Sequence, residues 1–267
     1  MRKILKEKIP EPIGNSIRFI WDFFGRFPES LEAFYHPWRR DTAKRLKQYE
    51  NRYQGERCFV IGNGPSLRKT DLTKLRNEYT FGMNRIYLMF PKLGFPTTFF
   101  VSVNDLVIEQ TAADIQKMAI SPFVSWRGRK WLKRADDIYF LYTTYTGPKF
   151  ARKVTGRLWE GATVTFVALQ LAYYFGFEKV ILIGVDHSFS TIGKPNTTVV
   201  SQGDDPDHFH PAYFRKGFRW QLPDLDTSEF AYAMARREFE ADGREVVDAT
   251  IGGKLIIFPK IKYDQLF

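Results

Sequence analysis

"CFVIGNGPSLRKTDL" (residues 58–72) begins as an apolar run, stops at Gly62-Asn63-Gly64-Pro65-Ser66 and continues with charged residues. A buried strand followed by a turn of small residues is how an open α/β sheet brings its backbone close to a ligand. The turn differs from both common phosphate-binding patterns, because Leu67 replaces the third dinucleotide-type glycine and no Gly-Lys-Ser/Thr follows. We expect a binding turn in which the Gly62 and Gly64 amides face a phosphate or nucleoside. The alternative is an ordinary turn at a strand end.

The rest of the chain alternates between strand-like and helix-like segments. Further strands are predicted at residues 80–84, 97–104, 123–126, 138–143, 179–186 and 245–250, and helices at 105–119, 161–176 and 228–243. The strand at 179–186 is apolar almost throughout, as in parallel sheets covered on both faces. Gly176 suits the end of the helix before it. The alternation predicts an α/β fold with a doubly wound, mostly parallel Rossmann-like sheet and helices on both faces.

Residues 1–52 are expected to form a separate basic, amphipathic helical arm, with residues 53–267 as the Rossmann-like domain. Apolar residues of this arm recur at helical spacing, namely Ile13, Ile17, Ile20, Trp21, Phe24, Leu31, Phe34, Tyr35 and Trp38. Pro28 should divide the arm into two helices. The arm either docks on the domain or lies on an anionic membrane surface.

Composition restricts the partners without choosing one. The net charge of +10 favours anionic partners, but the basic residues are dispersed and no nucleic-acid recognition module is present. No apolar stretch approaches the roughly 20 residues of a membrane span, and the first residues lack the apolar core of a signal peptide. We therefore expect a cytoplasmic protein, with peripheral contact at the inner face of the membrane as the alternative. The single cysteine, Cys58, is expected to be buried, and the sequence leaves a homo-oligomer open.

Candidate site residues follow several predicted strands. Asn84 and Asn104 end two of them, and together with Asn63 they could converge on a ribose, base or phosphate. Asp186, at the end of the strand 179–186, is followed by His187 and Ser188. Asp186 could hold a ribose hydroxyl, bind a metal or cap the next turn.

The segment 187–227, rich in Gly, Pro, Asp and His, is long for a connection and is expected to be functional. His208 or His210 could act as a general base. The alternatives are a metal site that includes Asp205 and Asp207, and a plain surface loop. Tyr213 and Arg215 are among the nearby residues that would suit an anionic, ring-shaped substrate.

An ordered set of motifs resembles known families. The segments VIGNGPSL, MNRIY, VSVND with IEQ, and GATVTFVALQLAYYFGFEKVILIGVD, followed by a loop with histidines, resemble bacterial sialyltransferases of glycosyltransferase family 42. They also resemble the related domain of motility-associated flagellin glycosyltransferases and the group labelled 6-hydroxymethylpterin diphosphokinase MptE-like. The resemblance covers about residues 56–258 and leaves out the arm.

The resemblance implies a cytidine-nucleotide site. Family residues that hold the nucleotide and its sugar match Asn63, Gly64, Asn84 and Asn104, and the family's aspartate after the buried strand matches Asp186. The turn Gly161-Ala162-Thr163 stands where the family has Thr-Ser-Gly near the base. His208 or His210 is the counterpart of the family's catalytic base. Where the family has a tyrosine that contacts the phosphate, this chain has His187 and Ser188, so Tyr213 or Arg215 would have to replace it.

The expected function is a glycosyltransferase of polysaccharide biosynthesis. It would move a sialic-acid-like or other acidic sugar from a CMP-activated donor to a glycan or protein acceptor, with a loop histidine as base and with neither metal nor cofactor. The first alternative is Mg²⁺-dependent diphosphate transfer from ATP to a pterin alcohol, for which Asp186, Asp204, Asp205 and Asp207 could supply carboxylates. The second is a nucleotide-binding or membrane-associated scaffold without catalysis.

Overall fold

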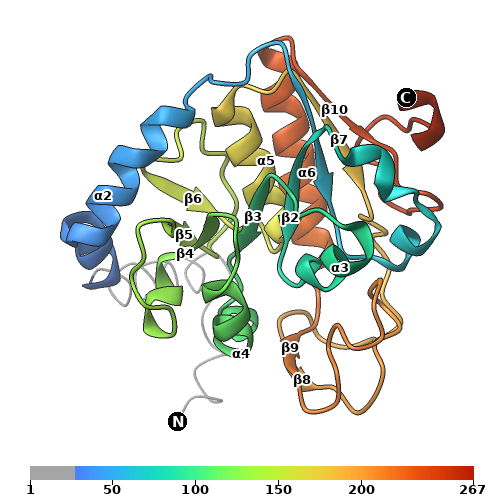
Figure 1. Cartoon of the computed structure of the whole chain (residues 1–267), viewed down its shortest axis with the longest axis horizontal. Helices are drawn as coiled ribbons and strands as arrows, with labels where there is room; N and C mark the ends of the chain where they lie inside the picture. Colours follow the sequence, from blue (N-terminus) through green and yellow to red (C-terminus); the bar gives the residue numbers. More distant parts are fainter. Residues whose placement is uncertain (1–27) are drawn as a thin grey trace, which may run out of the picture.

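An eight-stranded sheet runs through residues 28–267, the part of the chain that the computed structural model describes (Figure 1). Every pair of neighbouring strands in this sheet is parallel. In sheet order the strands are β10 (Glu245–Asp248), β7 (Lys179–Ile183), β1 (Arg57–Ile61), β2 (Tyr79–Met83), β3 (Phe99–Ser102), β4 (Pro122–Ser125), β5 (Tyr139–Thr144) and β6 (Arg157–Trp159). The predicted Rossmann-like parallel sheet is therefore confirmed.

Helices cover both faces of the sheet, because alternate strand residues point to opposite sides. The α-helices are α2 (Pro37–Leu46), α3 (Phe90–Leu93), α4 (Asp105–Gln116), α5 (Val164–Phe175) and α6 (Leu225–Ala241). Short 3-10 helices are Lys47–Tyr49, Pro65–Lys69, Leu72–Leu75, Ile86–Met89, Trp126–Lys130 and Tyr263–Leu266. In β1, Cys58 and Val60 belong to the core under α5 and α6, whereas Phe59 and Ile61 belong to the core that includes α4. Burial raises the pKa of the Cys58 thiol, which is fully enclosed as expected.

The α5 helix shows how the sequence builds one of these layers. Its residues are apolar nearly all round, and almost all are buried between the sheet and α6. The helix ends at Gly176, which has a φ of 95° and donates its amide to Ala172 and Tyr173. A side chain at Gly176 would also lie only 2.8 Å from the Cα of Asn51. Glycine is therefore required here both by the left-handed backbone and by the close approach.

The strand order places a crevice between β1 and β7. From β1 the chain builds β2 to β6 outward on one side, and it then returns to place β7 on the other side of β1. Neighbouring connections therefore leave in opposite directions at the carboxyl ends of β1 and β7. Open α/β sheets bind their ligands at such a switch point.

The segment 187–227 folds over this end of the sheet (orange in Figure 1). It contains the antiparallel pair β8 (Thr198–Val200) and β9 (Arg219–Gln221). The β8–β9 connection, residues 201–218, carries both loop histidines. Phe214 stacks on Phe218 and on Trp220, so this segment has a small aromatic core of its own.

The described part of the predicted arm packs along β5. Residues 28–35 are helical, and the chain breaks at His36 before α2 begins. Thr42 accepts a hydrogen bond from the Phe140 amide, and Arg45 donates to the Ile138 carbonyl, so α2 covers the part of β5 that β6 leaves free. The part of the predicted arm before Pro28 lies outside the described residues. None of the helices within residues 28–267 has the length and apolar character needed to cross a membrane.

Candidate functional site

A cavity of about 170 Å³ lies at the carboxyl ends of β1 and β7. Many of the predicted site residues line it, namely Gly62, Asn63, Gly64, Asn84, Ala162, Thr163, Asp186, His187, Ser188, His208 and Tyr213. The remaining predicted residues, Pro65, Ser66, Asn104, Gly161, His210 and Arg215, do not line it. We call this space the site cavity.

The turn after β1 is held against the end of β7. The Gly62 amide donates to Ile183 (2.7 Å) and the Gly64 amide to Gly184 (2.9 Å). A side chain at Gly62 would lie 2.2 Å from the Gly184 oxygen, and one at Gly64 would lie 1.8 Å from the Asp186 carboxylate. The prediction that these two amides face a ligand is therefore wrong. The glycines are needed because the two strand ends approach so closely.

Asp186, which follows β7, binds the same turn through its side chain. Its carboxylate accepts hydrogen bonds from the Ser66 amide (3.0 Å) and the Ser66 hydroxyl (2.6 Å). Ser66 is buried and Pro65 opens the short 3-10 helix that follows, so both residues shape the turn rather than line the cavity. Asp186 still lines the cavity, but much of its hydrogen-bonding capacity is used within the protein.

Asn63 and Asn84 present two neutral side chains to the cavity. The Asn63 side-chain oxygen is buried and, in the described part of the chain, has no hydrogen-bond partner. Asn84 has a φ of 52°, and its side-chain oxygen accepts from the Ser102 hydroxyl (3.0 Å). A buried amide oxygen without a donor is costly, so the Asn63 oxygen marks a place where a ligand donor would be stabilised.

Asn104 serves a different purpose. It caps α4, because its side-chain oxygen accepts hydrogen bonds from the Leu106 and Val107 amides, and its side-chain nitrogen donates to Gln221 (3.1 Å). The structure therefore brings together two of the three asparagines and leaves Asn104 at a helix N-terminus outside the cavity.

The start of α5 forms another wall. Gly161 and Ala162 both have positive φ values, 53° and 59°, and this turn delivers Thr163 as the N-cap of α5. Gly161 is packed against Ala231 and Phe166, which explains why it does not reach the cavity. The positive end of the α5 dipole is thus directed at the cavity, where it favours an anion.

His208 is oriented by a buried carboxylate. Its Nδ1 atom lies 2.8 Å from Asp205, whose carboxylate also accepts from the Asp207 and Phe214 amides. The imidazole stacks on Tyr213 with 4.0 Å between ring centroids. Within residues 28–267, its Nε2 atom has no hydrogen-bond partner. This arrangement places a proton on Nδ1 and leaves the Nε2 lone pair available.

His210 and Arg215 lie outside the site cavity. The Nδ1 atom of His210 accepts the Ala212 amide (3.1 Å), which fixes a local turn. Arg215 is exposed. Of the two histidines that the sequence could not separate, the structure places only His208 at the cavity, and it gives Arg215 no position from which to contact a phosphate there.

Tyr213 is fully enclosed beside His208. Burial, more than any other factor, raises the pKa of its hydroxyl well above the usual value, while Asn84 and Arg85 act in the opposite direction. The hydroxyl therefore remains protonated at neutral pH and can donate a hydrogen bond at the cavity wall.

His187 lies on the opposite wall. It has a φ of 55°, and its Nε2 atom lies 2.8 Å from Glu229 on α6. The side chain is thus fixed to α6, whereas Ser188 next to it adds a hydroxyl to the lining.

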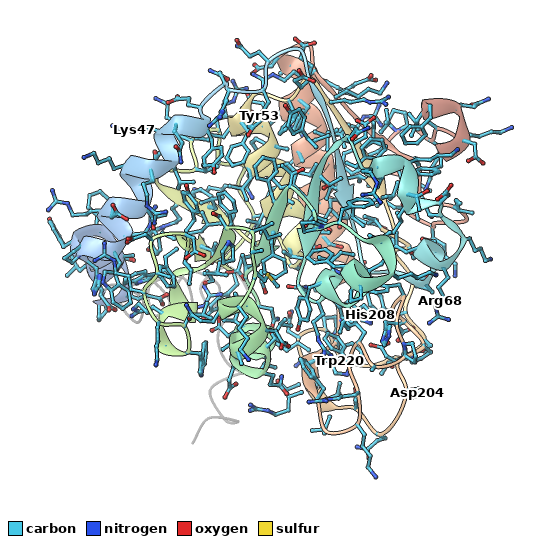
Figure 2. The ribbon with its side chains drawn as sticks, viewed as in Figure 1. Lys47, Tyr53, Arg68, Asp204, His208 and Trp220 are labelled. Atoms are coloured by element: carbon cyan, nitrogen blue, oxygen red, sulfur yellow. The ribbon has the colours of Figure 1, made fainter. Side chains whose placement is uncertain are left out.

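Two arginines that sequence reasoning missed hold the β8–β9 connection in place. Arg68 donates to the carbonyls of His208 (2.8 Å) and Phe209 (3.0 Å). Figure 2 labels Arg68 and His208 at this end of the sheet. Buried Arg85 donates to the carbonyls of Ala212 and Tyr213. Because both bind backbone carbonyls more than a hundred residues away, no local pattern could have revealed them.

The role of Asp205 was also missed, although its spacing held a signal. An aspartate three residues before a histidine within one tight loop can reach its Nδ1 atom, as Asp205 reaches His208 here. The alternative of a metal site instead treated Asp205 as an oxygen ligand of a metal ion. In the described part of the chain, no group of three or more His, Cys, Asp or Glu side chains is arranged to hold a metal ion.

Comparisons with known proteins place the chain in a family. The family model described as 6-hydroxymethylpterin diphosphokinase MptE-like matches residues 35–191. The chain belongs to this MptE-like family. The expected resemblance to this group is thus confirmed.

A solved structure of the sialyltransferase CstII from Campylobacter jejuni, in complex with a substrate analogue, cytidine-5′-monophosphate, is also similar. It is 12% identical, with a TM-score of 0.44, and the match covers 78% of this chain and 85% of that chain. Among curated proteins no match was found.

The MptE-like match covers only one side of the site. It includes Asn63, Asn84 and Asp186, and it ends at residue 191, before β8. The segment that carries Asp205, His208 and Tyr213 lies beyond it. The cavity therefore joins a wall that lies within the family match to a wall that lies beyond it.

Proposed function

We propose that this MptE-like protein is a glycosyltransferase that uses a CMP-activated donor. The transferred group would be a sialic-acid-like or other acidic sugar, and the acceptor a hydroxyl of a glycan or protein. The observation that carries the proposal is His208, fixed by buried Asp205 and with its Nε2 atom unoccupied, in a cavity at the sheet's switch point. Residues 53–267 would form the catalytic domain.

The reaction follows from this geometry. The acceptor hydroxyl oxygen attacks the anomeric carbon, its proton passes to His208 Nε2, and the bond between that carbon and the phosphate oxygen breaks. CMP leaves with the electron pair of the broken bond. Asp205 stabilises the imidazolium that forms, because it already accepts the Nδ1 proton. General-base catalysis of this kind contributes about 10²–10⁴-fold to the rate.

The donor would lie across the wall that the turn after β1 and the start of α5 form. The unpartnered oxygen of Asn63 would accept a hydrogen bond from the base or ribose, and the phosphate would lie near the N-terminus of α5. A cavity of about 170 Å³ is smaller than the roughly 300–1,000 Å³ of most small-molecule sites. We therefore expect the β8–β9 connection to shift when a complete nucleotide sugar binds.

The leaving phosphate would be stabilised by neutral donors. The Tyr213 hydroxyl stays protonated because burial raises its pKa, and the Thr163 and Ser188 hydroxyls line the same cavity. These groups replace the family tyrosine that is absent after Asp186. Hydrogen-bond donors aimed at developing negative charge are a general means of lowering the barrier.

The second candidate is the activity that the family name describes, a diphosphokinase acting on 6-hydroxymethylpterin. Membership of the MptE-like family favours it. It requires ATP, and its transition state is stabilised through Mg²⁺. Because the two candidates use different nucleotides, binding distinguishes them.

The test compares CMP with ATP plus Mg²⁺, using thermal stabilisation and calorimetry on the wild-type chain, Asn63→Ala and Asn77→Ala. Asn77 is exposed and provides the matched control. We expect CMP to raise Tm, by mass action, in the wild type and in Asn77→Ala, and to bind about tenfold or more weakly to Asn63→Ala. Stabilisation by ATP with Mg²⁺ and none by CMP would overturn the proposal in favour of the diphosphokinase.

A further inference from the structure

A second cavity, of about 460 Å³, lies at the opposite edge of the sheet from β10. It is enclosed by the helical residues 28–35, α2, β5 and the edge strand β6, and Figure 1 shows α2 beside β6 at that edge. The side chains that matter here are Phe34, Arg39, Arg40, Tyr142, Arg157 and Trp159. We call it the edge cavity. It shares no lining residue with the site cavity.

Arg39 is the central feature of the edge cavity. Its side chain is 4% exposed, and its Nη2 atom donates to the carbonyls of Thr155 (2.7 Å) and Gly156 (2.8 Å). Its Nε and Nη1 atoms are buried and have no hydrogen-bond partner among residues 28–267. A guanidinium carries five N–H groups, so the three on Nε and Nη1 find no acceptor in this part of the chain.

An unpaired buried cation is costly to the folded state. Burial lowers the pKa of Arg39 to about 10, which reflects the same cost, although the group remains charged at neutral pH. Since Arg39 also lines a cavity, an acceptor that enters this cavity would relieve the cost. The missing partner is therefore an anion.

The charge around Arg39 indicates which kind of anion. Arg40 and Arg157 also line the edge cavity, and among the described residues no Asp or Glu does. Arg157 donates to the Tyr142 hydroxyl (2.9 Å), which keeps its guanidinium at the rim. Three arginines without a carboxylate match a dianion with several oxygens, such as a phosphate, better than a single carboxylate.

Part of the remaining lining is apolar and aromatic. Phe34 is exposed although its ring is large, and Trp159 is partly buried beside it. A ligand that satisfied only the arginines would leave these rings uncovered. An organic substituent next to the phosphate would cover them.

We propose that the edge cavity binds a phosphate ester. Its phosphate would accept hydrogen bonds from Arg39 Nε and Nη1 and pair with Arg40 and Arg157, and its organic part would lie on Phe34 and Trp159. The proposal does not depend on the chemistry of the site cavity. The same phosphate chemistry could come from a soluble ester or from the headgroup of an anionic lipid.

The test uses the full chain and measures binding of butyl phosphate and of inorganic phosphate by calorimetry. Arg39→Gln and Arg157→Gln are the test variants. Arg134→Gln is the charge-matched control, because Arg134 is exposed and its guanidinium lies 3.9 Å from the Asp136 carboxylate. We expect affinity for butyl phosphate to fall about tenfold or more in each test variant and to stay within about twofold of the wild type in the control.

The two sources are separated by sedimentation with vesicles of phosphatidylcholine, with and without phosphatidic acid. Binding to phosphatidic acid vesicles that Arg39→Gln or Arg157→Gln removes would support the proposal with a lipid as the source. Binding of butyl phosphate without vesicle binding would support it with a soluble ester. Should neither probe bind, or should both test variants bind like the wild type, the proposal is overturned. If Arg39→Gln does not fold, Arg157→Gln alone decides.

Discussion

At the scale of single residues, the site depends on how closely β1 and β7 approach each other. Gly62 and Gly64 have no room for a side chain, and Asp186 closes the gap by accepting both donors of Ser66. The turn therefore positions Asn63 without binding ligand through its own glycine amides. Asn63 is the residue of this turn that faces the cavity with an unused hydrogen-bonding group.

Replacing Gly64 by alanine should destabilise the protein. The added Cβ would lie 1.8 Å from the Asp186 carboxylate, so β1 and β7 must separate or Asp186 must release Ser66. We expect a loss of about 1–3 kcal/mol in the free energy of unfolding, measured by urea titration. Gly147→Ala is the control, because nothing lies within 4 Å of a Cβ there, and it should change stability by less than about 1 kcal/mol. Equal effects of the two substitutions would contradict this account of the turn.

Several site residues could be predicted from the sequence, because strand ends in a parallel sheet converge. Asn63, Asn84 and Asp186 follow apolar strands, and all line one cavity. Asn104 follows a strand in the same way, but the helix after it begins immediately and uses the side chain as its cap. Position after a strand therefore predicts the edge of the sheet, whereas the choice between capping and binding depends on the next element.

At the scale of elements, the β8–β9 connection decides where His208 lies. Phe209 donates its amide to the Asn63 carbonyl. Arg68 binds the carbonyls of His208 and Phe209, and Arg85 binds those of Ala212 and Tyr213. These contacts join the connection to the turns after β1 and β2. They keep His208 over the site cavity while the exposed parts of the connection remain free to shift.

Removing Arg68 should loosen this connection without unfolding the domain. Arg68→Ala leaves the carbonyls of His208 and Phe209 without their charged donor, so we expect turnover of the donor to fall about tenfold. Trypsin should cleave faster at Arg215 and Lys216, which are exposed in the same connection. Limited proteolysis followed by mass spectrometry measures the rate. The adjacent exposed Lys69→Ala is the control, and the idea fails if both variants are cut at the wild-type rate.

Most of the elements could also be predicted, because buried strands and the long α5 helix carry strong periodic signals. The strand β6 was missed, since its three residues, Arg157–Trp159, are too few for a pattern and one of them is charged. The break at His36 within the described helical region was missed as well. Its local signal is Pro37, which suits the first position of a helix, and the His36 side chain caps α2 by accepting the Trp38 amide.

At the scale of the whole molecule, the basic charge is compatible with two separate anion-binding regions. The N-terminus of α5 lies at the site cavity, whereas three arginines line the edge cavity at the far end of the sheet. The sequence charge of +10 indicated anionic partners but could not divide them between two places. The edge cavity could not be predicted, since its arginines come from α2 and β6, which are far apart in the chain.

Stability should fall at alkaline pH, because the fold encloses many tyrosines. Burial raises the pKa of Tyr87, Tyr173 and Tyr174 to about 12, and it also raises the pKa of Tyr213 and Tyr232. In the unfolded chain these groups ionise near pH 10. Above that pH the unfolded state binds fewer protons, so the stabilisation present below pH 10 is lost as pH rises towards 12.

We expect Tm to fall by at least about 2–4 °C between pH 9 and pH 11, the shift that a loss of 1 kcal/mol causes in a chain of this size. Calorimetry measures Tm, and absorbance at 295 nm follows tyrosinate in the folded protein. A constant Tm, with all 13 tyrosines titrating together near pH 10, would contradict this expectation.

The most direct test of the central claim is the rate of CMP release from a CMP-activated acidic sugar by His208→Asn and His210→Asn. In His208→Asn the amide can still donate to Asp205, but no basic nitrogen remains, and in His210→Asn the side-chain oxygen can still accept the Ala212 amide. The account predicts that His208→Asn lowers kcat about 10²–10⁴-fold with little change in CMP affinity, while His210→Asn stays within about threefold of the wild type. A His208→Asn variant that turns over like the wild type, or equal losses in both variants, would contradict it.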